Sequence, residues 1–196
     1  NYDYNKFIYF ARKKILRYFL NKLWFIPDGY KIFMKKVVEY NIRFANAGKH
    51  IPEKDNSVDV VYSSHMLEHL DKLETEIFLN EVKRVLVPGG IVRIVVPDFD
   101  KLINDYSESN NPEKLIDDSC LVGEKPKTFI KKIQYLIQGH GWHFNMYNRK
   151  TFVNLFRKYG FKEIEIINPG ETRIKHKDGL DLYVFSDVSL FLEAIN

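Results

Sequence analysis

Two short apolar runs flank a helix-like segment in the middle of the chain, and this arrangement constrains the fold more than any other feature. Residues 58–63 and 91–96 are rich in β-branched side chains, which is typical of buried strands. Between them, residues 73–86 repeat apolar side chains at helical spacing, and a Pro-Gly-Gly sequence at 88–90 ends that helix. Strand, helix and strand in this order form a βαβ unit with parallel strands. The sequence therefore predicts an α/β fold.

Further elements are predicted on both sides of this unit. Residues 5–22 have the pattern of one amphipathic helix, whereas 31–41 are ambiguous and favour a strand over 37–39. Residues 161–167 and 181–187 alternate as strands do, which predicts an antiparallel hairpin at the end of the sheet. The other predicted helices cover residues 99–107, 129–138 and 151–159, and the polar stretch 108–128 is expected to be rich in loops.

The composition narrows the class of protein. The chain has 196 residues, of which 45% are hydrophobic and 29% charged, an ordinary balance for a globular protein. Cys120 is the single cysteine, which excludes an internal disulfide and a thiolate metal cluster. No apolar run approaches the roughly 20 residues needed to cross a bilayer, and no signal-peptide pattern is visible. We therefore expect a cytoplasmic protein.

Positive charge is concentrated near the N-terminus. Residues 1–50 hold eleven Lys or Arg and three Asp or Glu, against a net charge of +4 for the whole chain. A solvated helix face accounts for this charge, and peripheral contact with an anionic surface is the alternative. No nucleic-acid-binding motif is visible. We divide the chain into a basic helical segment, 1–36, and an α/β domain, 37–196.

Four segments occur in an order and at spacings that resemble a known family. They are 51–70 (IPEKDNSVDVVYSSHMLEHL), the Val-Pro-Gly-Gly sequence at 87–90, residues 140–161 (HGWHFNMYNRKTFVNLFRKYGF) and the final hairpin. Together they are similar to the type 11 methyltransferase domain of the class I family. The resemblance covers about residues 37–187. It implies a Rossmann-like, doubly wound, mostly parallel sheet with a C-terminal antiparallel hairpin.

The same resemblance implies a function. Members of the family transfer a methyl group from S-adenosylmethionine to a small molecule, and by analogy of fold the acceptor expected here is a sugar or another cell-envelope intermediate. The family opens with a Gly-x-Gly loop, whose glycines let backbone approach the cofactor closely. Gly29 stands alone in the corresponding region of this sequence. A non-catalytic domain of the same fold, binding a partner through its basic N-terminal segment, is therefore the alternative.

Candidate cofactor contacts lie at the ends of predicted strands, because ligands of open α/β sheets bind beyond the carboxyl ends of the strands. Ser63, Ser64 and His65 end or follow the strand at 58–63 and are the best placed. Glu39 is the candidate acid for the ribose hydroxyls, and a surface glutamate beside two lysines is the alternative. Asn46 is the candidate partner of the adenine amino group, or else a simple turn residue.

Candidate acceptor contacts lie in the His-rich junction and after the strand at 91–96. His143 is the first choice of general base toward an acceptor hydroxyl and His140 the second, because imidazole titrates near pH ~6.5. A packed aromatic junction explains these residues equally well. Trp142 and Tyr147 are expected to line the acceptor pocket. Asp98 is expected either to bind substrate or to cap the following helix.

The histidine spacings also suggest a metal site. His65 and His69 are four residues apart, and His140 and His143 are three apart, so each pair could share an ion. No cysteine joins them, and the resemblance to the Leu-Glu-His motif of the family accounts for His69 without a metal. We interpret Glu68-His69 as a structural pair and expect no metal.

Overall fold

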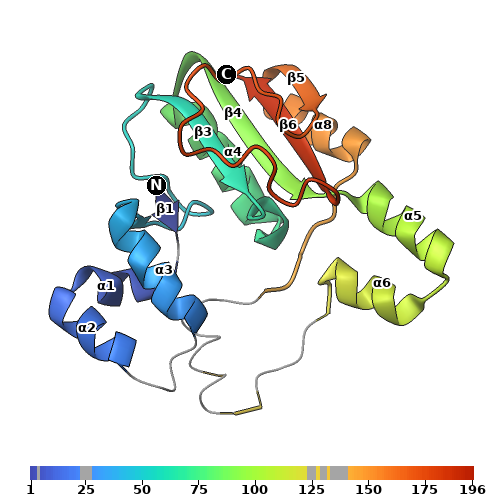
Figure 1. The fold of residues 1–196 in the computed structure, drawn as a ribbon. Helices are drawn as coiled ribbons and strands as arrows, with labels where there is room; N and C mark the ends of the chain where they lie inside the picture. Colours follow the sequence, from blue (N-terminus) through green and yellow to red (C-terminus); the bar gives the residue numbers. More distant parts are fainter. Residues whose placement is uncertain (4, 23–27, 123–126, 129–131, 133–140) are drawn as a thin grey trace. The chain divides into compact units, whose positions relative to one another are not determined.

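The computed structural model describes residues 1–3, 5–22, 28–122, 127–128, 132 and 141–196 (Figure 1). The chain divides into two compact units: Asn1–Ala47 with Glu124–His140, and Gly48–Gly123 with Gly141–Asn196. The predicted boundary after residue 36 falls inside a helix of the first unit, α3 (Asp28–Glu39). The predicted helix over 129–138 and the candidate base His140 lie outside the described residues.

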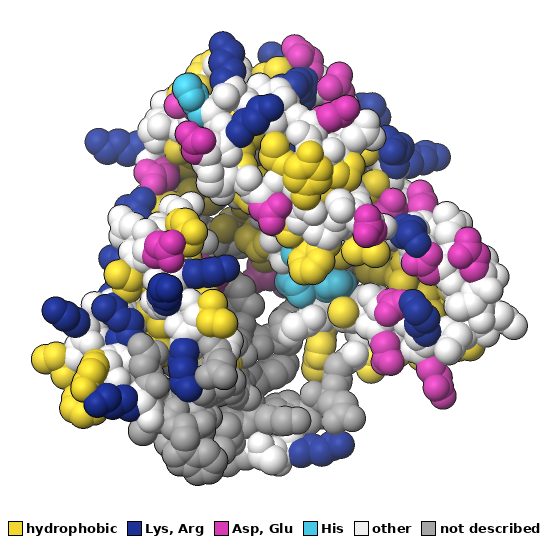
Figure 2. Space-filling view, in the orientation of Figure 1, with side chains coloured by type: hydrophobic (Ala, Val, Ile, Leu, Met, Phe, Trp, Pro, Cys, Tyr) yellow, Lys and Arg dark blue, Asp and Glu magenta, His cyan; other side chains and the backbone are white. Residues whose placement is uncertain are grey.

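The first unit begins with two short helices where the sequence predicts one. α1 (Phe7–Arg12) and α2 (Lys14–Lys22) are separated at Lys13, whose ψ of 102° is extended. Ile8 and Ala11 are buried as their spacing predicts, but Ile15 and Phe19 are exposed, because the break turns α2 away from that face. Apolar and basic side chains consequently lie next to one another on the surface of this unit (Figure 2).

The strand predicted over 37–39 is wrong, because these residues belong to α3. Met34 and Val37, three residues apart on one helical face, are fully buried against Ile8 and Ala11. A single helical turn of buried residues was too short to show its period in the sequence. Among the described residues of this unit, β1 (Tyr2–Asp3) and β2 (Arg43–Phe44) are strands and pair in parallel.

The second unit contains the predicted βαβ arrangement. β3 (Val58–Ser64) and β4 (Leu86–Pro97) pair in parallel and are connected by α4 (Lys72–Val85). β6 (Ser189–Ile195) lies between β4 and β5 (Lys162–Ile167) and is antiparallel to both. The α/β class, the Rossmann-like arrangement and the C-terminal antiparallel pair are confirmed. The sheet, of order β3-β4-β6-β5, is mixed rather than mostly parallel as predicted, because of its three strand pairs only β3 with β4 is parallel.

The second strand of the antiparallel pair lies later in the chain than predicted. Residues 181–187 form no strand, and β6 begins at Ser189. Phe191 is 1% exposed whereas Phe185 is 66% exposed. A central strand is buried on both faces and therefore shows a continuous apolar run rather than alternation. The run Leu-Phe-Leu at 190–192 carries that signal, and the alternating pattern at 181–187 was misleading.

In the part of the chain that the structure describes, the remaining helices are α5 (Phe99–Ser109), α6 (Pro112–Ser119), α8 (Arg149–Lys158) and the 3-10 helix η1 (Leu67–His69). α6 lies in a stretch expected to be loop-rich. Figure 1 shows α4 and α8 on one face of the sheet, while the segment 168–188 crosses the other. Among the described helices, none is long and apolar enough to cross a membrane.

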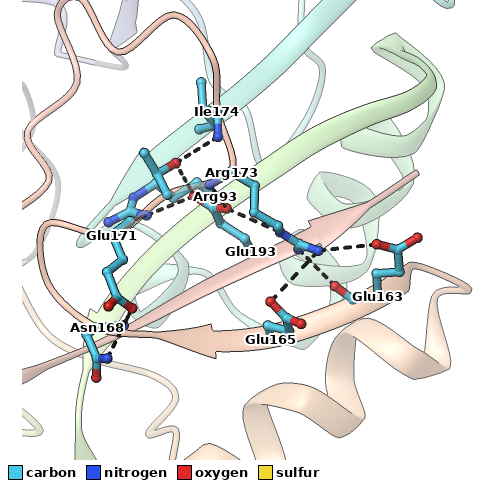
Figure 3. A network of polar contacts seen from close by, with 9 residues as sticks. Arg93, Glu163, Glu165, Asn168, Glu171, Arg173, Ile174 and Glu193 are labelled. Carbon is cyan, nitrogen blue, oxygen red and sulfur yellow. Dashed lines mark hydrogen bonds and ion pairs between the residues drawn. The ribbon is translucent and has the colours of Figure 1, made fainter.

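The face beneath segment 168–188 contains a buried network of polar contacts (Figure 3). Arg93 on β4 and Glu193 on β6 are both fully buried, and Arg93 Nη1 also donates to the carbonyl oxygen of Glu171. Tyr62 on β3 donates its hydroxyl to the carbonyl oxygen of Asp181. These contacts fix segment 168–188 to the sheet by polar bonds rather than by apolar packing alone.

Candidate functional site

The carboxyl ends of β1 and β2 bring polar groups to one edge of the first unit. Asp3 ends β1, and its Oδ1 accepts a hydrogen bond from the backbone N–H of Asn5 at 2.7 Å. Burial raises the pKa of Asp3, and this hydrogen bond opposes the effect. Asn46 follows β2 by two residues and is half-buried, next to Ala45, whose N–H donates to the carbonyl oxygen of Asp3. An acidic and an amide side chain thus follow paired strands.

Glu39 does not occupy such a position. It ends helix α3, so the argument that made it a strand-end acid fails together with the strand predicted at 37–39. Glu39 is exposed and lines an open hollow of about 530 Å³ together with Arg17, Lys31, Lys35 and Val38. Its surroundings are basic, as expected for a surface glutamate beside lysines.

Asp3 is a strand-end acid that sequence reasoning missed. A two-residue strand at the first positions of a sequence shows no alternation, so periodicity could not reveal it. The sequence does carry one chemical signal for a turn after Asp3. An aspartate can accept a hydrogen bond from the backbone N–H two residues later, here that of Asn5, as in an Asx turn.

Ser63, Ser64 and His65 lie where the sequence predicts, at the carboxyl end of β3. His65 Nδ1 is 3.0 Å from Ser64 Oγ, and His65 Nε2 is 3.2 Å from Ser189 Oγ, at the start of β6. The backbone N–H of His65 donates to the carbonyl oxygen of Val95 at 2.9 Å, and its φ of 49° is left-handed. The imidazole is therefore held between two hydroxyl groups at the edge of the sheet.

The environment of His65 favours its neutral form. Burial lowers the pKa of His65, and the nearby His69 lowers it further. The ring packs edge to face against Phe185, with 4.8 Å between the centroids. A neutral imidazole carries one donor and one acceptor, so the two serine hydroxyls can orient to match it or a bound ligand.

A second cluster consists of Glu68, His69 and His143. Its first two residues lie three and four positions after His65. The segment 142–145 docks on η1: the N–H groups of Phe144 and Asn145 donate to the carbonyl oxygen of Glu68 at 2.7 and 3.2 Å. His69 Nδ1 is 2.9 Å from the carbonyl oxygen of Trp142. These contacts bring His143 next to His69, with 4.8 Å between the ring centroids.

Glu68 is the most unusual group of this cluster. Its side chain is 1% exposed, and neither carboxylate oxygen accepts a hydrogen bond from any other described residue. Burial raises the pKa of Glu68 to about 7, against the opposing effect of its own backbone N–H. His69 Nε2 lies 3.9 Å from Glu68 Oε1. The two side chains of the predicted structural pair thus lie near each other, without a hydrogen bond between them.

His143, the first candidate base, is partly buried, and its Nδ1 has no hydrogen-bond partner among the described residues. Burial lowers the pKa of His143, His69 and His65 lower it further, and a hydrogen bond with the Ser119 backbone acts in the opposite direction. The ring is therefore neutral near pH 7 and has a lone pair available for a proton or another electrophile.

Tyr147 and Asp98 lie beside one another, joined by a parallel bridge between their backbones. Tyr147 is buried, and burial is the main cause that raises its pKa to about 12; the charge of Glu68 adds to the effect, and Thr75 opposes it. The Asp98 side chain accepts from the Asp100 N–H at the start of α5, which is the capping alternative of the two roles predicted for it.

Part of the chain is similar to a known protein family. Residues 30–94 match the profile of a family described as a methyltransferase domain, type 11. The matched segment includes 51–70 and 87–90, so the resemblance drawn from these motifs is confirmed. An uncharacterized protein of Methanocaldococcus jannaschii is 36% identical over 73 residues, which are 35% of this chain and 31% of that protein. The chain thus covers about a third of this curated relative.

Solved structures with a similar backbone arrangement include two proteins described as S-adenosylmethionine-dependent methyltransferases. The first, from Thermotoga maritima, is 16% identical with a TM-score of 0.49, over 83% of this chain and 69% of that one. The second, from Archaeoglobus fulgidus, is 14% identical with a TM-score of 0.47, over 84% of this chain and 72% of that one.

Proposed function

We propose that this chain, whose residues 30–94 match a methyltransferase domain, takes part in methyl transfer from S-adenosylmethionine to a small-molecule acceptor. The observation that carries the proposal is the placement of polar groups at strand ends. Within the first unit, Asp3 ends β1 and Asn46 lies two residues after β2. Within the second unit, Ser64 ends β3 and His65 follows it. In open α/β sheets this is the end of the strands at which ligands bind.

The chemistry of these groups fits the adenosine part of the cofactor. A carboxylate such as that of Asp3 accepts from two adjacent ribose hydroxyls, and the carbonyl of Asn46 accepts from an adenine amino group. Gly29, alone in the region of the family's glycine loop, lies in α3 and has nothing within 4 Å of an added Cβ, so it forms no close-approach cradle.

The bound cofactor supplies a methyl group on a positively charged sulfur, and the residues of this chain would position the acceptor. Holding the acceptor atom in line with the methyl group is the main requirement of such a displacement. His143 is the proposed base when the acceptor is a hydroxyl, since its Nδ1 is unpartnered among the described residues. Trp142 and Tyr147 would line the acceptor pocket, while Asp98 holds the start of α5.

The acceptor class is the finer part of the proposal. A sugar or another cell-envelope intermediate remains the prediction, since such acceptors present the hydroxyl groups that an imidazole base would serve. It is tested by a screen of sugar nucleotides and polyols with S-adenosylmethionine carrying a labelled methyl group.

Calorimetric titration with S-adenosylhomocysteine tests the cofactor directly. Micromolar binding that is weakened by Ser64→Leu but unchanged by Ser57→Leu would support the proposal. Ser57 is exposed and precedes β3, so it provides a matched control at the opposite end of the strand. Absence of binding by a folded protein, or equal affinities of the two variants, would contradict it.

The second candidate function is binding of an anionic surface by the first unit. Ile15 and Phe19 on α2 are exposed and lie among the basic residues of that helix, a combination typical of helices that lie in a membrane interface. Co-sedimentation with vesicles containing phosphatidylserine would detect it. Loss of binding in Phe19→Ser, with retention of S-adenosylhomocysteine binding, would separate this function from methyl transfer.

A further inference from the structure

The carboxylate of Glu68 needs a partner that the neighbouring side chains do not provide. Its side chain is 1% exposed, and both oxygens lack a hydrogen bond from any other described residue. Buried carboxylates are ordinarily paired with a cation, hydrogen-bonded, or bound to a metal. The facing polar atom, His69 Nε2, lies 3.9 Å from Glu68 Oε1, beyond hydrogen-bond distance.

The orientation of the His69 ring gives its Nε2 a lone pair. Nδ1 lies 2.9 Å from the carbonyl oxygen of Trp142, and since a carbonyl only accepts, Nδ1 carries the proton. In the neutral ring, Nε2 therefore presents a lone pair toward the lone pairs of Glu68. Metal-binding histidines show this same arrangement, with one nitrogen donating to a backbone carbonyl and the other facing the ion.

His143 supplies the third possible metal ligand. Its Nδ1 is buried and has no hydrogen-bond partner among the described residues. The backbone fixes its position, because the N–H groups of Phe144 and Asn145 donate to the carbonyl oxygen of Glu68, and the Asn145 side chain donates to that of Leu70. Ligand atoms of Glu68, His69 and His143 all lie within 4.8 Å of one another.

We propose that Glu68, His69 and His143 bind a divalent transition-metal ion, with Zn²⁺ as the first candidate. Two imidazoles and a carboxylate suit Zn²⁺ or Co²⁺ better than Mg²⁺ or Ca²⁺, which prefer oxygen ligands. Zinc–ligand distances of about 2.0–2.2 Å place tetrahedral ligands about 3.3–3.5 Å apart, so binding needs the three side chains to converge by roughly 1 Å. Three protein ligands leave the fourth position open.

This inference revises the expectation of no metal. The sequence suggested two pairs, His65 with His69 and His140 with His143. The structure instead brings His69 and His143 together with the carboxylate of Glu68, which the histidine spacing does not reveal. The inference does not rest on methyl transfer. A bound ion would occupy the His143 lone pair that the proposed base role needs. His143 therefore cannot bind the ion and act as the base at the same time.

The test is a titration of the chelator-treated protein with Zn²⁺ in competition with a chromogenic chelator. We expect one equivalent per chain, and an affinity at least tenfold lower in Glu68→Gln, which keeps the size of the side chain, and in His143→Gln. His176→Gln, at an exposed histidine in the same unit, provides the matched control and should bind as the parent does. Circular dichroism checks that each variant is folded.

Absence of stoichiometric binding by the folded parent protein would overturn the proposal, as would equal affinities of Glu68→Gln and His176→Gln. Should the ligand variants fail to fold, the visible spectrum of the Co²⁺-loaded parent decides. Intense bands of a four-coordinate site support the proposal, and the weak spectrum of aqueous Co²⁺ contradicts it. Titration of the same samples with S-adenosylhomocysteine reports on the proposed function separately, because the metal readouts involve no cofactor.

Discussion

Arg93 and Glu193 face each other directly across β4 and β6, with Nη1 2.9 Å from Oε1 and neither side chain exposed (Figure 3). Glu193 also accepts from the hydroxyl of Thr172 and from the backbone N–H of Arg173. One carboxylate therefore connects the centre of the sheet to the start of segment 168–188. Because a buried charge without its partner is costly, this pair should dominate the response of the second unit to substitution.

Replacing Glu193 with Gln should lower the free energy of unfolding by about 3–5 kcal/mol, since it leaves the guanidinium of Arg93 without a counter-charge. The combined replacement Arg93→Leu with Glu193→Leu should cost less than the sum of the two single changes. Urea denaturation measures each value, with Glu163→Gln as the exposed control. An effect of Glu193→Gln no larger than that of the control would contradict this account.

Glu81 should make stability depend on pH in the acid range. The hydrogen bond from Arg84 is the main cause that lowers the pKa of Glu81 to about 2, and burial opposes it. A folded-state pKa below the ordinary glutamate value of 4.5 gives stability that is present above pH 4.5 and is lost as pH falls toward 2. In urea titrations, parent and Glu81→Gln should therefore differ at about pH 6 and converge toward about pH 2. A difference independent of pH would refute the assignment.

The strand-end argument predicts opposite outcomes for two acidic residues of the first unit. Asp3→Asn should weaken binding of S-adenosylhomocysteine roughly tenfold or more, the range expected for a lost hydrogen bond to a charged group. Glu39→Gln should leave the affinity unchanged, because Glu39 ends a helix. Calorimetry compares the two variants under identical conditions. The reverse order of effects would restore Glu39 as the cofactor acid and exclude Asp3.

The start of α8 depends on a reciprocal pair of hydrogen bonds. Asn148 Oδ1 accepts from the Thr151 N–H at 2.9 Å, and Thr151 Oγ1 accepts from the Asn148 N–H at 3.1 Å. Asn148→Ala should lower the free energy of unfolding by about 1 kcal/mol. Asn148→Asp should retain most of the stability that the cap contributes, because aspartate also caps helices well. Thermal denaturation followed by circular dichroism distinguishes the two variants. Equal stability of the parent and Asn148→Ala would show that the cap contributes nothing.

The parts of the fold that the sequence predicted are those where independent signals agree. Around 58–96, β-branched runs, helical spacing and a Pro-Gly-Gly stop all point to one βαβ unit, and the structure contains it. Residues 37–39 and 181–187 carried one weak signal each. Tertiary packing decided both: Val37 is buried in a helix, and β6 follows the continuous apolar run after Ser189.

The candidate site likewise has a part that the sequence predicted and a part that it could not. The strand predicted at 58–63 placed Ser63, Ser64 and His65 at its carboxyl end, and the structure has them there. The strand pattern could not reveal that Glu68 and His143 lie near each other, because 75 positions separate them and no sequence pattern shows that a carboxylate is buried without a partner. Only the docking of segment 142–145 on η1 makes that cluster visible.

The strand order β3-β4-β6-β5 also has a consequence for synthesis on the ribosome. β6 is made after β5 but pairs between β4 and β5, so the centre of the sheet is empty until Ser189–Ile195 emerge. Until then, two strand edges are open to other nascent chains, and the Arg93 guanidinium has no carboxylate opposite it. Stalling shortly before residue 189 would therefore leave a chain prone to aggregate, although β3, β4 and β5 have already been translated.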